Sequence, residues 1–325
     1  MAMRHLLHCV LAWLVACAMS PVFAQAPPQF TGNRELLLAG DFAALERLYP
    51  VEPAPAAHDF QSEMPSVYFF RALDLGQGAD SWPQEDKATR AWLERSPDSV
   101  PAALARAQVF GWQGGRLDAA GQWAKAETAL REMEQLLAAV KPKATRDMQW
   151  HTLSLSLGHY QGWAAARIRS TVEAGLDVDP ASMVFHKTAG AALAPDWRAS
   201  AEALEWLARQ GAARTPSQRA TTYAFSRMWT AEYIEVVYSR PFGAGLMDWD
   251  LMNRGLTELY RSTGHPFYLD AHAALACRAS DKGATAALLG RIGTTPIVPD
   301  ARKRWGGVSH YDNCKKWAEA GALKS

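Results

Sequence analysis

Cysteine is rare in this chain, which has only four in 325 residues. Cys9 and Cys17 lie near the start, and Cys277 and Cys314 lie near the other end. No Cys-x-x-Cys spacing occurs, so neither a thioredoxin-like redox pair nor a cysteine-based zinc site is expected. In an exported chain, two distant cysteines instead predict one disulfide, for which the loop-entropy model gives about 4 kcal/mol of stabilisation. Two buried, reduced thiols are the alternative.

Motifs for metal binding and for nucleophilic catalysis are also missing. The sequence contains no His-Glu-x-x-His and no Gly-x-Ser-x-Gly, so we expect no metal, no cofactor and no catalytic residue. His265 and His272 lie on one predicted helix face near Asp270, but we expect His265 to cap that helix and His272 to pack. The glycine-rich stretch 111–115 has no preceding strand and no following Lys-Ser/Thr, so we interpret it as a helix C-terminal cap rather than a phosphate loop.

Long apolar runs are confined to the first 24 residues. Arg4 supplies a positive start, Leu6 to Met19 form an apolar run broken by one histidine, and Val22-Phe23-Ala24 carries the small residues that a signal peptidase requires. This run is shorter than the roughly 20 residues of a transmembrane helix. We therefore expect a signal peptide over residues 1–24, cleavage before Gln25, a periplasmic or secreted protein, and no transmembrane segment.

The leader leaves a second interpretation open. Leu14-Val15-Ala16-Cys17 fits a bacterial lipobox, in which Cys17 is lipidated and anchors the protein to a membrane as a lipoprotein. Cleavage before Gln25 is preferred because Ser20-Pro21-Val22-Phe23-Ala24 forms a complete cleavage region.

Neither sign of charge is in excess. Arg4 is the only charged residue of the leader, so the rest of the chain has equal numbers of acidic and basic residues. The one basic run, Arg302-Lys303-Arg304, is typical of a solvated corner. A nucleic-acid-binding chain carries a basic stripe, so no nucleic-acid partner is expected.

Apolar residues instead recur at the spacing of amphipathic helices along most of the chain, and no convincing alternating strand pattern occurs. The clearest apolar stripe has steps of three and four and comprises Trp123, Ala126, Leu130, Met133, Leu137 and Val140. Pro, Gly and Asp turns divide the chain into about a dozen short helices. The ranges expected to be helical are 31–38, 42–49, 67–75, 81–95, 100–112, 123–140, 145–157, 162–174, 180–193, 199–209, 217–238, 248–262, 267–279 and 284–292, with one short helix after them.

These helices predict an all-α fold of stacked hairpins, an α-solenoid-like arrangement in which pairs recur near the 34-residue period of tetratricopeptide repeats. A Pro-rich tether over residues 25–30 precedes one helical-repeat domain over 31–325. Within this domain, the stretch 248–317 is expected to be a C-terminal clamp, in which the disulfide pins a helix pair to the last helix.

Three stretches carry a resemblance to a known family. They are Arg34 to Glu46, Asp248-Trp249 with Gly255-Leu256, and Cys277 to Lys282. Together they resemble a bacterial family of exported or cytosolic proteins, described only as a domain of unknown function, with tetratricopeptide-like helices. The resemblance implies a fold and supplies no catalytic residue. Such relatives have glycine where this chain has Ser280, so the turn is expected there without a glycine cap.

Tryptophan is abundant, with 13 in the chain. In an alanine-rich helical stack, packing of large against small side chains explains most of them, and periodicity places Trp123 and Trp206 on core faces. A rim of aromatic side chains that line a binding groove is the alternative. The candidates for such a groove are Trp163, Trp197, Trp229, Tyr233, Trp249 and Trp305.

Two functions follow from this pattern. We expect a non-enzymatic module of the bacterial cell envelope that binds or scaffolds a protein or peptide partner. The alternative is a glycan-binding or glycan-active helical domain, since that chemistry uses two carboxylates flanking a cleft and rim tryptophans. The acidic pairs that could serve it are Asp248 with Asp250, Glu202 with Glu205, and Glu232 with Glu235, although paired acids on helices are usually solvated.

Overall fold

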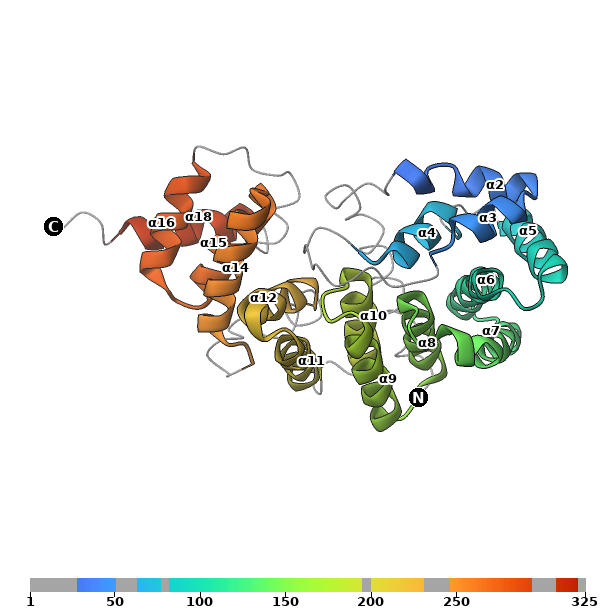
Figure 1. Cartoon of the computed structure of the whole chain (residues 1–325). Coiled ribbons are helices and arrows are strands. Elements are labelled where there is room, and N and C mark those ends of the chain that lie inside the picture. The colour runs from blue at the N-terminus through green and yellow to red at the C-terminus, as the bar shows by residue number, and fades with distance from the viewer. Residues whose placement is uncertain are drawn as a thin grey trace. The chain divides into compact units, whose positions relative to one another are not determined.

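The structure is a computed structural model and describes residues 28–50, 63–76, 82–194, 200–230, 246–293 and 308–320. These ranges contain fifteen α-helices, two short 3-10 helices (η2, Pro28–Phe30, and η3, Pro216–Gln218) and no strand (Figure 1). The prediction of an all-α protein is therefore confirmed. In the same ranges, no helix combines the length and the apolar character that crossing a membrane requires.

The chain forms two compact units, Met1–Thr188 and Ala189–Ser325, and the boundary between them falls inside helix α10. The described helices that lead up to this boundary are α2 (Asn33–Ala39), α3 (Phe42–Leu48), α4 (Pro65–Leu73), α5 (Trp82–Arg95), α6 (Val100–Ala119), α7 (Trp123–Ala144), α8 (Met148–Gln161), α9 (Ala165–Val178) and α10 (Met183–Leu193). Those of the second unit are α11 (Ser200–Arg214), α12 (Arg219–Thr230), α14 (Trp249–Thr263), α15 (Pro266–Arg278), α16 (Lys282–Ile292) and α18 (Val308–Glu319).

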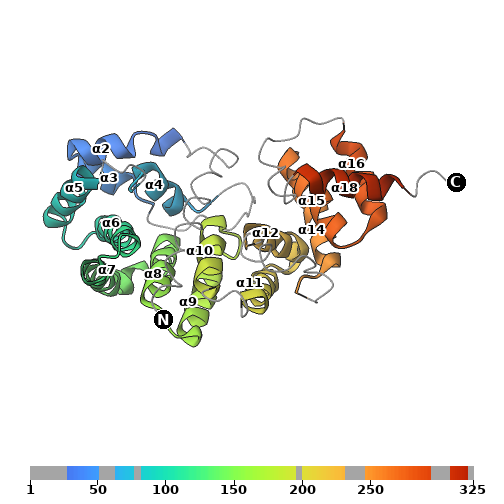
Figure 2. The same cartoon turned by 180° about the vertical axis from the view of Figure 1, so that it is seen from behind.

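Helices that follow one another in the chain pack as neighbours within each unit. In the first unit, α6 lies beside α7 in both views, and α8 contacts α7 and α9 (Figures 1 and 2). In the second unit, α12 packs between α11 and α14, and α15 contacts both α14 and α16. The expected pairing of short amphipathic helices is present in both units.

The apolar stripe predicted for α7 forms its buried face. Ala126, Leu130, Met133, Leu137 and Val140 are all buried there. Only the first member departs from the prediction, since the side chain of Trp123 is 58% exposed. It is the first residue of α7 and follows the exposed turn 120–122, so it precedes the part of the helix that faces the core.

The glycine-rich stretch 111–115 does not end its helix, contrary to the prediction. Helix α6 continues through it to Ala119, although glycine costs about 1 kcal/mol in a helix interior. A Cβ atom on Gly114 would lie 2.8 Å from Leu130 Cδ2, and one on Gly115 would lie 2.7 Å from the hydroxyl oxygen of Tyr160. The glycines therefore let α6 pack closely against α7 and α8.

The break predicted at 158–160 is also wrong, because α8 runs through it to Gln161. A Cβ atom on Gly158 would lie 2.7 Å from Trp163 Cε3, so this glycine again makes room for a neighbour. The helix ends instead at Gly162, which has φ +64° and donates its amide to the carbonyls of Gly158 and His159. This is the left-handed cap that glycine favours.

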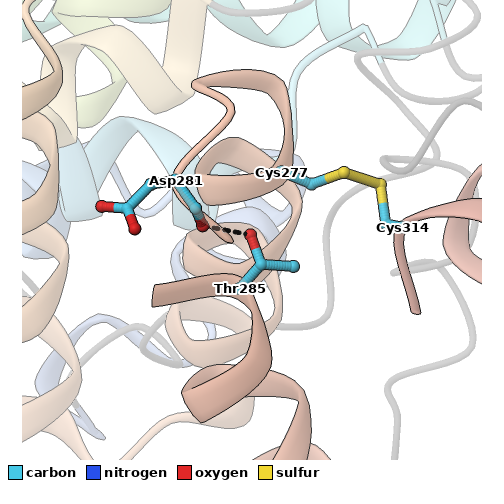
Figure 3. The surroundings of a disulfide bond; sticks show 4 residues. All are labelled: Cys277, Asp281, Thr285 and Cys314. Atoms are coloured by element: carbon cyan, nitrogen blue, oxygen red, sulfur yellow. Dashed lines mark hydrogen bonds between the residues drawn. A yellow bond between two sulfur atoms is a disulfide. The ribbon is translucent and has the colours of Figure 1, made fainter. Parts of the chain in front are cut away.

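Cys277 and Cys314 form the predicted disulfide, with an S–S distance of 1.98 Å and a Cα–Cα distance of 6.0 Å. The bond joins the last turn of α15 to α18 in the second unit (Figure 3).

The turn between α15 and α16 lies beside this bond. Ser280 takes the left-handed conformation with φ +60°, so the turn forms without the glycine that the resemblance implies. Asp281 then caps α16: its Oδ1 accepts the amide of Ala284 at 2.9 Å, and its carbonyl accepts the hydroxyl of Thr285 at 2.7 Å (Figure 3). The indole N–H of Trp249 donates to the other carboxylate oxygen, Oδ2, at 3.0 Å.

Candidate functional site

Three of the six aromatic groove candidates, Trp197, Tyr233 and Trp305, lie outside the described residues. Of the others, Trp229 is only 4% exposed and stacks on Phe267 with ring centroids 5.9 Å apart. Trp249 is partly buried and holds the start of α16 through Asp281. These two side chains therefore pack within the second unit.

The remaining candidate, Trp163, belongs to a polar cluster at the surface of the first unit. We call this cluster the Trp163 patch and define it as Glu134, Gln161, Trp163 and Arg167. The indole N–H of Trp163 donates to Gln161 Oε1 at 2.8 Å, and Gln161 Nε2 donates to Glu134 Oε2 at 3.1 Å. Arg167 closes the ring, because its Nη2 lies 3.8 Å from Glu134 Oε1 and its guanidinium carbon lies 3.2 Å from the centre of the indole ring.

Three consecutive helices bring the Trp163 patch together. Glu134 comes from α7, Gln161 is the last residue of α8, and Arg167 lies in the first turn of α9. The left-handed Gly162 reverses the chain, so that the amide of Trp163 donates back to the carbonyl of Gly158 at 2.9 Å. The tryptophan is thus fixed by the backbone on one side and by the arginine on the other.

The patch remains open to solvent. The side chains of Glu134 and Arg167 are 44% and 55% exposed, and Gln161 is also exposed. Tryptophan and arginine are the residue types that contribute most to binding at protein interfaces. A side chain whose rotamer is already fixed loses less entropy when a partner binds. The patch therefore presents an indole, a guanidinium, an amide and a carboxylate in a pre-organised arrangement.

A second polar cluster lies in the second unit and is buried. The Tyr223 hydroxyl donates to Glu205 Oε2 at 2.6 Å and accepts the amide of Asp248 at 2.8 Å. Arg227, with a fully buried side chain, donates from Nη2 to the carbonyl of Leu246 at 3.2 Å, and its Nε lies 3.8 Å from Glu205 Oε2. Burial lowers the pKa of Arg227, and burial together with the hydrogen bond to Glu205 raises the pKa of Tyr223.

The carboxylates proposed for glycan chemistry take part in other contacts. Glu205 Oε1 pairs with Arg209 Nε at 2.7 Å, in addition to its contacts with Tyr223 and Arg227. Asp248 caps α14 by accepting the amide of Leu251 at 3.1 Å. Glu202 and Asp250 are exposed, whereas Glu232 and Glu235 lie outside the described residues. The contacts with Tyr223, Arg209 and Arg227 occupy both carboxylate oxygens of Glu205, so this side chain serves the buried cluster.

The buried histidines serve the fold. His151 donates from Nε2 to the carbonyl of Thr145 at 2.9 Å, and His272 Nε2 lies 2.7 Å from Asn253 Oδ1. Burial lowers the pKa of His272 to about 4. His265 is the N-cap of α15 and accepts the amide of Phe267, as the sequence predicts. Among the described residues, no three His, Cys, Asp or Glu side chains are grouped so that they could hold a metal ion.

Sequence reasoning singled out Trp163 but missed its three partners in the Trp163 patch. Arg167 lies four residues after Trp163 within the predicted helix 162–174, and this spacing was the one usable signal. In the structure Trp163 lies in the turn before α9. Glu134 belongs to a different helix, and Gln161 reaches the indole because α8 continues further than predicted. The buried cluster around Arg227 was missed because its members come from three separate elements.

These features define an all-α protein of paired helices, with one disulfide in its second unit. Comparison of the chain with family models, curated proteins and solved structures finds no match. The resemblance to a bacterial domain of unknown function therefore stays an expectation.

Proposed function

We propose that this chain is an exported, non-catalytic module that binds a protein or peptide partner in the cell envelope, and that the Trp163 patch contacts the partner. The observation that carries this proposal is the closed ring of contacts among Glu134, Gln161, Trp163 and Arg167 at an exposed surface. The partly buried indole offers apolar area. The carboxylate, the amide and the guanidinium offer hydrogen bonds to a peptide backbone or to charged side chains.

A repeated feature supports a tetratricopeptide-like arrangement of the helices. His151 in α8 and His186 in α10 each hydrogen-bond to a carbonyl six residues earlier, Thr145 and Pro180. Both histidines occupy the same position relative to their helix starts. They are separated by close to the ~34-residue period of tetratricopeptide repeats. Repeats of this type commonly present extended surfaces for peptides or proteins.

The disulfide supports the proposed location. Such bonds persist in oxidising compartments and are rare in the cytosol of ordinary bacteria. Export would be mediated by the leader over residues 1–24. Mass spectrometry of the mature protein tests this directly: an N-terminus at Gln25 supports cleavage, and a lipidated N-terminus at Cys17 supports the lipoprotein alternative.

The binding proposal can be tested with a displayed library of random peptides. We expect the oxidised protein to enrich a family of sequences, and the Arg167→Ala variant to bind the enriched peptides at least about tenfold more weakly, as hot-spot residues do. Isothermal titration or fluorescence anisotropy measures the change. Arg131→Ala is the matched control, because Arg131 is also an exposed arginine but lies on α7 outside the patch.

Two results would overturn this proposal. One is the absence of any enriched sequence, and the other is equal binding by the wild type, the Arg167→Ala variant and the Arg131→Ala variant. Circular dichroism on each variant shows whether a loss of binding reflects a loss of fold.

A further inference from the structure

The guanidinium of Arg167 holds most of the unused hydrogen-bonding capacity of the Trp163 patch. An arginine side chain carries several N–H donors and no acceptor. Within the part of the chain that the structure describes, none of these donors forms a hydrogen bond. The carboxylate oxygen of its ion pair, Glu134 Oε1, lies 3.8 Å from Nη2, which is too far for a hydrogen bond. The side chain is 55% exposed, so these donors are open to a partner.

The polar atoms between Trp163 and Glu134 are already engaged. Gln161 accepts the indole N–H of Trp163 through its oxygen and donates to Glu134 Oε2 through its nitrogen. The largest polar group of the patch that is still open is thus the guanidinium of Arg167. The partner group that satisfies it is a hydrogen-bond acceptor.

The stacking on Trp163 determines how this guanidinium is presented. Its central carbon lies 3.2 Å from the centre of the indole ring, and at this distance the flat guanidinium lies against the ring face. One of its faces is therefore covered, while its edge, which carries the N–H groups, stays accessible. Two adjacent N–H groups on such an edge match the two oxygens of a carboxylate. The backbone turn at Gly162 fixes the indole, so the edge is held in place before a partner arrives.

We propose that Arg167 receives a carboxylate from an aspartate or glutamate side chain of the partner, a step that rests on the binding role given above to the Trp163 patch. The partner is thus an acidic peptide segment, held by parallel hydrogen bonds from one guanidinium. The free protein already places a carboxylate of this kind, that of Glu134, beside the same guanidinium. With Glu134 Oε2 bound to Gln161, the other oxygen stays 3.8 Å from Arg167 and leaves its donors unsatisfied.

Glu134 has two opposite effects on such a partner. Its ion pair helps to keep Arg167 beside the indole, which favours binding. Its negative charge also repels a second carboxylate that approaches Arg167, which opposes binding. Because both side chains are about half exposed, each effect is small, and the repulsion is worth a factor of about two to five in affinity. The stacking on Trp163 still holds Arg167 when Glu134 is neutralised, so the repulsion decides the sign of the change.

Isothermal titration with the peptides enriched on the oxidised protein tests this assignment. Each peptide is made unchanged, with every aspartate and glutamate replaced by asparagine and glutamine, and with its C-terminal carboxylate amidated. We expect the second form to bind at least about tenfold more weakly and the third form to bind as the unchanged peptide does. These substitutions leave the protein unaltered, so the result does not depend on whether a variant folds.

Variants of the patch provide a second measurement. We expect Glu134→Gln to bind the unchanged peptide about two- to fivefold more tightly and the acid-free peptide no more tightly. Glutamine keeps an oxygen for the bond from Gln161. Glu132→Gln is the matched control, because Glu132 is also exposed on α7 but lies outside the patch. Arg167→Lys keeps the charge without the planar fork, so it should bind the unchanged peptide about tenfold more weakly.

The possible results separate the carboxylate assignment from the binding role. If no peptide is enriched, both are overturned. If the enriched peptides need Arg167 but keep their affinity without acidic side chains, or lose it only when the C-terminus is amidated, the binding role stands and the assignment is overturned. Weaker binding of the unchanged peptide by Glu134→Gln would also overturn the assignment, because the charge of Glu134 would then favour the partner rather than repel it.

Discussion

Gly255 shows how a single residue sets the distance between two helices. A Cβ atom at this position would lie 2.1 Å from the carbonyl oxygen of Ala220 and 2.6 Å from the Cβ of Ala224. The contact is with backbone, which cannot rotate away as a side chain can. The close approach of α14 to α12 therefore depends on the absence of a side chain at Gly255.

We expect Gly255→Ala to lower the free energy of unfolding by about 1–3 kcal/mol, as overpacked cores do. Gly290→Ala is the control, because Gly290 is also helical but a Cβ there meets nothing within 4 Å. This second variant should gain about 0.5–1 kcal/mol from better helix propensity. Urea unfolding followed by circular dichroism measures both. Equal effects of the two substitutions would contradict the role assigned to Gly255.

At the scale of single elements, the local sequence predicts where a helix begins better than where it ends. Asp248 and Asp281 each accept an amide three residues later. The helices were predicted to begin at 248 and 284, close to the observed starts at Trp249 and Lys282. Helix ends were predicted less well, because 111–115 and 158–160 contain glycines that usually stop a helix. Those glycines are required by contacts with Leu130, Tyr160 and Trp163, which come from other helices or a later loop and leave no local signal.

The difference between local and long-range signals also explains why the disulfide could be predicted and the Trp163 patch could not. The pairing of Cys277 with Cys314 could be predicted because the other two cysteines, Cys9 and Cys17, lie in the predicted signal peptide. The partners of Trp163 could not, because glutamate, glutamine and arginine are common on exposed helix faces. Only the packing of α7, α8 and α9 shows which of them meet.

The contribution of a single helix cap to stability can be tested at Asp281. Its carboxylate caps α16 and also accepts the indole N–H of Trp249, which belongs to α14. We expect Asp281→Ala to cost about 1–2 kcal/mol, since it removes a cap and leaves a partly buried indole donor without this acceptor. Chemical denaturation measures the loss. The Asp250→Ala control changes an exposed first-turn carboxylate of α14 and should stay within about 0.5 kcal/mol of the wild type.

At the scale of the whole molecule, the disulfide lies entirely within the second unit. We expect reduction, or the double variant Cys277→Ser, Cys314→Ser, to destabilise that unit by about 2–4 kcal/mol. The first unit should keep its stability. Hydrogen exchange measured peptide by peptide compares the stability of the two units, with α6 and α7 as the reference for the first unit. An equal loss of protection in both units would show that they unfold as one.

The bond between Cys277 and Cys314 also changes the connectivity of the chain. It closes a covalent ring that contains every residue from 278 to 313. A protease that cuts one peptide bond in this ring opens the ring but releases no fragment, because the two pieces remain joined through sulfur. In a compartment rich in proteases, the last helix thus stays tethered to its neighbours after a cut that would otherwise detach it.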